Sequence, residues 1–278
     1  MGPSGGGSQH ESGACSSSSG GDAADGACGV GAGGRDGQPA FKVNRTAPVV
    51  FQVGRLGAQY GAWVHRPEPG APRFFASSLA EACSKTPWWV VPLVWLPLFV
   101  AVQVYCASVL AVGAGALVGW GALGVVAWQG LEYLIHRFVF HADPSSYWGI
   151  TLHFVFHGCH HKYPSDGQRL VFPPLPASAL VAAVYGALAA CLPPPCALPL
   201  FAGMGYGYVA YDCLHYAVHH SRAGRGCLRL PLLRDLQRRH MHHHYRDHGS
   251  GFGISSPLYD VLLGTRAKLT SYPTRRAI

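Results

Sequence analysis

Two long stretches of the chain contain no charged residue, and both are predicted to be helical and to enter a membrane. They cover residues 87–131 and 170–211. A single helix over the first stretch would be about 67 Å long, whereas the hydrocarbon core of a bilayer is about 30 Å thick. We therefore expect two crossings in this stretch, joined by a turn near residues 113–119.

The second uncharged stretch also divides into two arms. Pro193, Pro194 and Pro195 interrupt it, and a helix interior does not tolerate consecutive prolines. The arms, residues 177–192 and 197–211, are each about five residues shorter than a comfortable span, so this hairpin either crosses the membrane or dips into it. The pattern predicts an all-α integral membrane protein with four transmembrane helices in two hairpins.

The remaining segments differ in composition from these hairpins. Residues 1–40 are rich in Gly and Ser and are expected to be disordered, because they cannot bury an apolar core. Residues 41–86 mix aromatic and basic side chains and are expected to lie at the cytosolic interface. The membrane domain is predicted to cover residues 87–264, and residues 265–278 to form a loose basic tail.

Composition and charge support a place in the membrane. Only 12% of the residues are charged and 49% are hydrophobic, against about 25% charged in soluble domains. The net charge is +8, but every Lys and Arg lies outside the hairpins. An even number of crossings then places both termini in the cytosol. This distribution argues against a nucleic-acid partner. The basic C-terminal part either suits anionic headgroups or an acidic redox partner, or only sets the topology.

The nine cysteines form no CxxC pair and show no regular spacing. A disulfide framework is therefore not expected, in agreement with a reducing cytosolic face. Cys159 lies within a cluster of histidines, where it is either a metal ligand or a small spacer between ligands.

Histidines carry the candidate chemistry. Ten of the 16 fall into four tight clusters, all on the predicted cytosolic side of the hairpins. Neutral imidazole is the commonest protein ligand for zinc and iron, and one ion takes about four to six donors, so ten imidazoles indicate a two-metal site in a helical cap. The clustered residues are His136, His141, His157, His160, His161, His215, His219, His240, His243 and His244.

Helical spacing predicts how the clusters converge. Positions i, i+3 and i+4 share a helix face, so His157, His160 and His161 are expected to point into one pocket. The same spacing recurs at His240 to His244, and His215 and His219 form an i, i+4 pair.

The pair His136 and His141 does not fit an α-helical face, because five positions place the two side chains about 140° apart. Either the helix is locally broken there, or the two rings serve different metals.

Four further residues border the clusters. His153 lies four residues before His157, so spacing alone leaves it open as another ligand. His220 lies about 100° away from its neighbour and is expected outside the ligand set. Glu132 and Asp212 lie one turn before His136 and His215, and we expect their carboxylates to accept the second N–H of these imidazoles.

These clusters and their neighbouring phrases resemble the fatty acid 2-hydroxylases of the fatty acid hydroxylase and sterol desaturase superfamily. The resemblance covers roughly residues 47–265 and is strongest to the plant and algal branch. The phrases that carry it are HRFVFH at 136–141, HFVFHGCHHK at 153–162, RLVFPP at 169–174, YDCLHYAVHH at 211–220, HMHHHY at 240–245 and GFGI at 251–254.

The resemblance implies a set of ligands and their setting. In that family ten histidines hold two metal ions on the cytosolic face of a four-helix domain in the endoplasmic reticulum. By position in the motifs, the ligands here are the ten clustered histidines, with His153 and His220 outside them. The metal is iron in the working enzyme, although zinc occupies these positions in crystallised members.

The implied activity is 2-hydroxylation of long or very long acyl chains of fatty acids or ceramides in sphingolipid synthesis. Dioxygen is the oxidant, and electrons are expected from a separate cytochrome b5, because the first 86 residues show no haem-binding histidine pair. The alternatives are a sterol or other lipid oxidase or desaturase of the same superfamily and, from another class, a metal-binding membrane transporter. Transporters usually carry ionisable residues inside the membrane, and the two uncharged stretches have none.

Overall fold

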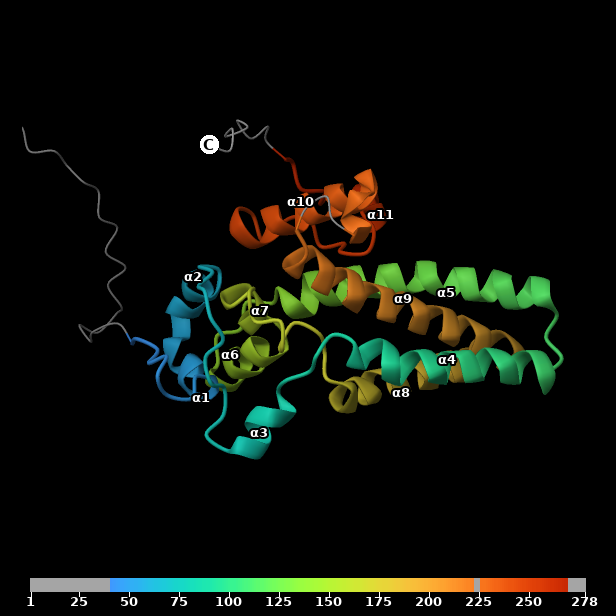
Figure 1. Cartoon of the computed structure of the whole chain (residues 1–278), viewed down its shortest axis with the longest axis horizontal. Coiled ribbons are helices and arrows are strands. Elements are labelled where there is room, and N and C mark those ends of the chain that lie inside the picture. Colours follow the sequence, from blue (N-terminus) through green and yellow to red (C-terminus); the bar gives the residue numbers. More distant parts are fainter. Residues whose placement is uncertain (1–40, 223–225, 270–278) are drawn as a thin grey trace, which may run out of the picture. The chain divides into compact units, whose positions relative to one another are not determined.

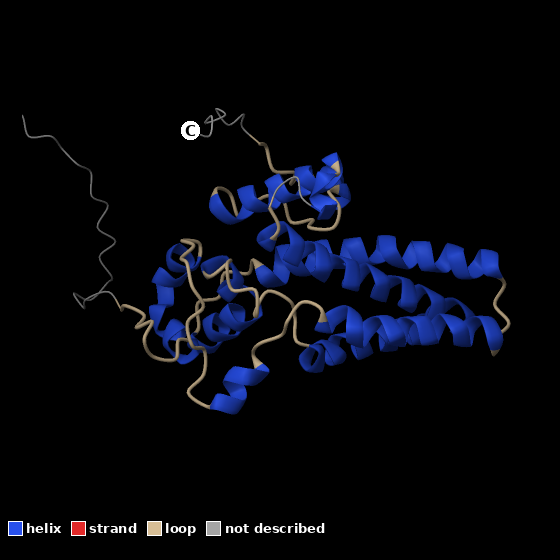
Figure 2. Cartoon of the chain, viewed as in Figure 1, coloured by secondary structure: helices blue, strands red, loops and turns tan. Residues whose placement is uncertain are grey.

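The computed structural model describes residues 41–222 and 226–269. All regular secondary structure in this part of the chain is helical, as predicted (Figures 1 and 2). The predicted leader, residues 1–40, and the end of the predicted tail, residues 270–278, lie outside the described residues.

Four long helices form a bundle in which α9 packs against each of the other three (Figure 1). Small residues allow this packing. A side chain on Gly124 of α5 would collide with the Leu200 carbonyl of α9, and one on Gly203 would collide with the Gly121 carbonyl. The helices are α4 (Val90–Ser108), α5 (Ala114–Leu134), α8 (Pro174–Cys191) and α9 (Pro194–His220).

Within residues 41–222 and 226–269, three helical segments are long and apolar enough to cross a bilayer: Val90–Ser108, Ala114–Phe140 and Pro174–Cys191. The α9 helix is different, because about half of its residues are buried and it packs against all three other helices. It also carries tyrosines, histidines and an aspartate, which lower its mean hydropathy. Four crossings therefore stay a prediction.

The turn of the first hairpin differs from the expected one, whereas the second hairpin turns at the predicted prolines. The first turn occupies residues 109–113 and not 113–119, so Gly115 and Gly119 lie inside α5, where an apolar helix tolerates them. In the second hairpin, Pro194 and Pro195 form the start of α9. Proline is tolerated there because the N–H groups of the first helical turn have no partner within the helix, so a residue without an N–H loses no hydrogen bond. The α9 helix also continues past the predicted end at Tyr211, through the polar residues to His220.

The shorter helices form the part of the molecule that carries the histidines. One apolar core joins α1, η1 and α2 to α6 and η3 through side chains such as Val53, Tyr60, Ile150 and Phe154. The elements are α1 (Val50–Val53), η1 (Gly54–Gln59), α2 (Tyr60–Val64), α3 (Ser78–Cys83), η2 (Ile135–Phe140), α6 (Tyr147–His153), η3 (Phe154–Gly158), α7 (Cys159–Lys162), η4 (Gly226–Arg229), α10 (Pro231–Tyr245) and α11 (Leu258–Leu262).

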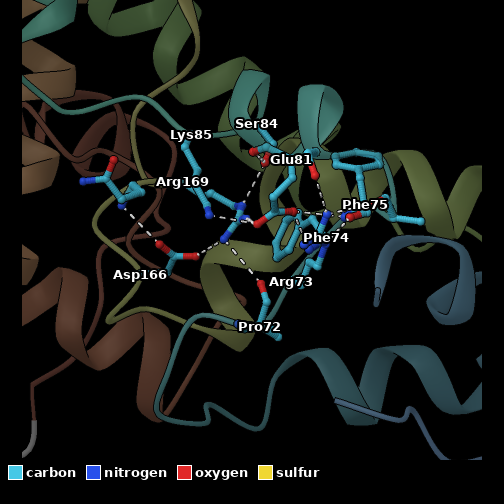
Figure 3. Close-up of polar contacts among 12 residues, drawn as sticks. Pro72, Arg73, Phe74, Phe75, Glu81, Ser84, Lys85, Asp166 and Arg169 are labelled. Atoms are coloured by element: carbon cyan, nitrogen blue, oxygen red, sulfur yellow. Dashed lines mark hydrogen bonds and ion pairs between the residues drawn. The ribbon is translucent and has the colours of Figure 1, made fainter. Parts of the chain in front are cut away.

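A buried ion cluster fastens α3 to the loop that precedes α8 (Figure 3). Arg169 donates to Glu81 at 2.5 Å and to Asp166 at 2.6 Å, and its guanidinium lies 3.9 Å from the centroid of the Phe74 ring. Burial alone would raise the pKa of Glu81. Hydrogen bonds from Lys85 and from two backbone N–H groups, together with the Arg169 charge, outweigh burial and lower this pKa to about 2.

The segment that begins at Thr265, expected to be a loose tail, is packed in its described residues. Thr265 Oγ1 lies 2.9 Å from the Tyr133 hydroxyl, and Arg239 donates to the Ala267 carbonyl at 2.5 Å. Ala267 is buried. The packed region thus extends at least to this residue.

Candidate metal centre

Two π-helical turns shape the first two histidine clusters. In η2, the N–H of His141 donates to the carbonyl of His136, five residues earlier, at 3.1 Å. This i to i+5 bond is the mark of a π-helix, which widens the turn so that residues five apart lie on one side. The helix is therefore locally altered at His136 and His141, and the two rings face the same pocket. A second π-turn, η3, begins at Phe154 and contains His157.

All ten predicted ligands come together, in two groups of five. Within each group the candidate nitrogen atoms lie within 4.8 Å of one another, and the two groups are built from five helical segments, with His141 directly after the first of them. Group 1 consists of His136, His141, His157, His161 and His243, and group 2 of His160, His215, His219, His240 and His244.

The expected convergence of whole triads is wrong. His157 and His161 belong to group 1, but His160 belongs to group 2. The reason is angular: residues i and i+4 are about 40° apart around a helix, whereas neighbouring residues are about 100° apart. The α10 helix divides its triad in the same way, with His243 in group 1. Each of these helices therefore contributes to both groups.

The spacing of the nitrogens fits one metal ion in each group. A metal–nitrogen distance of about 2.1 Å places ligands at right angles about 3.0 Å apart and opposite ligands about 4.2 Å apart. Two Nε2 atoms that face each other at such distances have room for only one hydrogen between them, so one hydrogen bond at most can form. A cation between the two atoms would accept the lone pairs of both. The close Nε2 pairs are His136–His157 at 3.2 Å, His157–His161 at 3.0 Å, His141–His243 at 2.9 Å, His160–His215 at 2.9 Å and His219–His240 at 2.8 Å.

Burial favours the neutral form that a metal ligand needs. It lowers the pKa of His160 to about 3, and it holds the pKa of His161, His243 and His244 well below the ordinary value, with neighbouring imidazoles adding to the effect. These rings are unprotonated at neutral pH, so binding a cation does not first require the loss of a proton.

Backbone carbonyls orient two of the rings. His136 Nδ1 donates to the Phe252 carbonyl at 2.6 Å, and His243 Nδ1 donates to the Ser250 carbonyl at 2.8 Å. In this tautomer each Nε2 keeps a free lone pair that points into group 1. We call residues 250–255, which supply both carbonyls, the carbonyl loop.

Glu132 supports this loop and does not accept an imidazole N–H as expected. Its carboxylate accepts from the N–H of Ile254 at 2.6 Å, from the N–H of Ser255 at 2.9 Å and from the Ser255 hydroxyl. Its contribution to His136 is therefore indirect, through the loop whose Phe252 carbonyl that ring contacts.

Asp260 of α11 holds the other side of the carbonyl loop. It accepts from the N–H of Phe252 at 3.0 Å and of Gly253 at 2.7 Å. Gly251 has φ +74°, and a side chain on Gly253 would collide with the Ser256 carbonyl. The Gly-Phe-Gly phrase is thus required by the shape of the loop. The sequence reasoning missed Asp260, although it is the one acid of α11.

The other expected neighbours of the ligands lie outside both groups. Within the described residues, Asp212 Oδ2 and His215 Nδ1 both lack a hydrogen-bond partner, so the expected contact between them is not formed. His153 Nδ1 lies 2.6 Å from the Tyr60 hydroxyl, and His220 stacks on Tyr216 at 4.6 Å.

Two further residues lie close to the ten histidines without belonging to either group. His65 stacks on His248 with ring centroids 3.7 Å apart and lies 5.4 Å from the ring of His161. Cys159 is a buried spacer outside both groups, and burial raises its pKa to about 12.

An apolar cavity of about 380 Å³ adjoins the two groups. His157 of group 1 and His160 and His215 of group 2 line one part of it. Most of the remaining wall is apolar and comes from the four long helices. An acyl chain in this cavity would lie against both groups.

Comparisons with known proteins agree with this arrangement. Residues 121–265 match the model of the fatty acid hydroxylase family. The chain is 42% identical over 231 residues to the dihydroceramide fatty acyl 2-hydroxylase FAH1 of Arabidopsis thaliana, covering 81% of this chain and 93% of that protein. It is 41% identical over 237 residues to the fatty acid 2-hydroxylase of Rattus norvegicus, covering 78% of this chain and 63% of that protein. A solved structure of full-length Scs7p, in which only the hydroxylase domain is visible, superposes with a TM-score of 0.74 at 34% identity, over 82% of this chain and 86% of that one.

Proposed function

Because the chain belongs to the fatty acid hydroxylase family, we propose that it hydroxylates long or very long acyl chains at the carbon beside the carbonyl group, on a fatty acid or a ceramide. One oxygen atom of dioxygen enters the C–H bond and the other leaves as water, with two electrons and two protons from a donor. The product would enter sphingolipids.

The observation that carries this proposal is the junction of the apolar cavity with the two histidine groups. His157, His160 and His215 form the only part of the cavity wall, among the described residues, where imidazoles meet apolar side chains. A substrate whose chain lies among apolar residues therefore presents its polar end to these rings. The apolar wall also excludes water from the reacting carbon.

The ten histidines of groups 1 and 2 are the proposed ligands of two metal ions. Iron, when bound there, supplies the redox chemistry that dioxygen activation requires, which zinc cannot supply. The protein's part is to keep the imidazoles neutral and oriented. Burial does the first, and the carbonyl loop does the second at His136 and His243. Glu132 and Asp260 hold that loop in place.

The proposal places the protein in the endoplasmic reticulum membrane, with both termini and the metal centre in the cytosol. A separate cytochrome b5 would supply the electrons. The excess of Arg and Lys after His219 suits an acidic redox protein.

Expression in yeast that lacks its own acyl 2-hydroxylase tests the activity. We expect 2-hydroxylated sphingolipids to reappear, as detected by mass spectrometry. Unchanged lipids from a well-expressed protein loaded with iron would contradict the proposal. In membranes from these cells, added cytochrome b5 and its reductase should raise the rate, and a rate independent of them would exclude this donor.

A further inference from the structure

The cavity changes in character from one end to the other. Its polar end lies at His157, His160 and His215, with Asp212 beside them. The other part of its lining includes Phe99, Val184, Phe201 and Gly205, which offer no charge and no side-chain hydrogen bond. A chain that places its reacting end at the histidines must therefore extend toward this apolar end.

Three aromatic rings from three different helices lie across the bundle at the apolar end. Phe201 of α9 has its ring centroid 5.2 Å from Tyr185 of α8 and 5.5 Å from Phe99 of α4. Phe99 also stacks at 6.0 Å on Trp95 of its own helix, and it is 1% exposed. These rings form a floor, of which Phe99 and Phe201 face the cavity.

The distance from this floor to the histidines matches the length of a lipid chain. Gly205 and His215 are ten residues apart on α9, which corresponds to about 15 Å along a helix. That is about half of the 30 Å hydrocarbon core, the share of one leaflet. A chain of ordinary membrane length would therefore fill the cavity, whereas a very long chain would have to bend or displace the floor before its reacting end could arrive at the histidines.

Gly205 fixes the position of the Phe99 ring. A Cβ on Gly205 would overlap this ring, and the three heavy atoms nearest to it all belong to Phe99. The ring therefore rests directly on the backbone of α9. Any side chain at position 205 would push it out of its place.

From this geometry we propose that Phe99 closes the inner end of the cavity and sets the length of acyl chain that the protein accepts. The inference rests on the proposed hydroxylase function and names the residue that selects among its substrates. Phe99 contacts only the chain end and acts by occupying space.

A competition assay tests this role. Membranes containing the protein receive equal amounts of palmitoyl and lignoceroyl ceramide, and the two 2-hydroxylated products are measured by mass spectrometry. Phe99→Ala removes most of the floor, so we expect the ratio of the very long to the long product to rise about tenfold or more. Phe99→Leu, which keeps most of the packing, should raise it less. Val100→Ala is the matched control, because Val100 is the next residue of α4, is half exposed and does not line the cavity.

An unchanged product ratio in an active Phe99→Ala protein would overturn the proposal. Binding provides a second measurement that does not depend on turnover. Palmitoyl ceramide should stabilise the purified wild-type protein against heat more than lignoceroyl ceramide does, and Phe99→Ala should remove or reverse this order. If no variant gives product but the order of stabilisation changes as stated, the hydroxylase function fails and the role of Phe99 stands. If the order is the same in both proteins, the role of Phe99 fails.

Discussion

At the scale of single residues, neighbouring histidines of one chain differ sharply in what they contact. His157 lies in group 1 and also lines the cavity, whereas His242 belongs to neither group. We predict that His157→Ala abolishes activity and lowers the bound metal from about two ions per chain to about one, because group 1 loses a central nitrogen. His242→Ala should keep both. Activity assays and elemental analysis check this, and equal losses in the two variants would mean that the groups are assigned incorrectly.

The carboxylates behind the carbonyl loop allow a second prediction. Asp260→Asn turns one acceptor oxygen into an N–H donor, which then faces either the N–H of Phe252 or that of Gly253. The loop should shift, and His136 should lose its carbonyl partner. We expect metal affinity to fall about 10- to 100-fold in competition with a chelator. Asp235→Asn, which removes an ion pair with Arg239 on α10, is the control and should leave the affinity unchanged.

The sequence predicts the histidines of the site but not the residues that support them. The ten histidines are visible as clusters, because ligands from one helix must lie within one or two turns. Glu132 stood out because it lies one turn before His136, but its partners lie more than 100 residues later in the chain and leave no trace in local spacing. The stacking of His65 on His248 is equally remote in sequence.

At the scale of elements, the π-turn η2 explains why α-helical periodicity did not place His136 and His141 on one face. A spacing of five residues contradicts an α-helical face, and the structure meets it with an i to i+5 bond at His141. Spacing alone left a local break in the helix and two separate metals as alternatives, and the π-turn confirms the first. The division of the triads between two groups was also beyond the sequence, because it requires knowing on which side of α7 and α10 each pocket lies.

The link between α3 and the loop before α8 leads to a prediction about pH. The pKa of Glu81 is about 2 in the folded protein, below its ordinary value of 4.5. Its contribution to stability is therefore complete above about pH 4.5 and is lost as the pH falls through 2. At pH 7, Glu81→Gln should lower the free energy of unfolding by about 2 kcal/mol and the melting temperature by about 5 °C.

The difference between wild type and Glu81→Gln should shrink as the pH is lowered from 7 toward about 3, as measured by thermal unfolding in detergent. Leu79→Ala is the control, because Leu79 is exposed on the same helix and does not titrate. Its difference from wild type should not vary with pH. A Glu81→Gln difference that stays constant over this range would exclude the charged cluster as its source.

At the scale of the whole molecule, the sequence and the structure give different numbers of candidate membrane-spanning helices. The uncharged stretches predict four crossings, and three segments of the described part of the chain meet the length and hydropathy of a span. The α9 helix is central to the bundle, so its burial against protein replaces contact with lipid. Hydropathy alone cannot identify such a helix. Its polar residues lower its mean hydropathy, although neighbouring helices shield them from lipid.

Glycosylation reporters test the topology. Acceptor sites inserted in the turns at residues 109–113 and 192–193 should be glycosylated, because both turns are predicted to face the lumen. Sites at residues 142–146 and 246–249 should stay unmodified in the cytosol. Modification of only the first turn would show that α8 and α9 enter the membrane without crossing it.

The division of each histidine triad between the two groups also fixes when the metal centre can be completed during synthesis. Group 1 needs His243, and group 2 needs His240 and His244, all from α10. This helix leaves the ribosome after both hairpins, and the carbonyl loop that orients His136 follows it. Before α10 has been made, neither group is complete, so the proposed metal ions would find their full set of ligands only after this helix and the carbonyl loop have emerged.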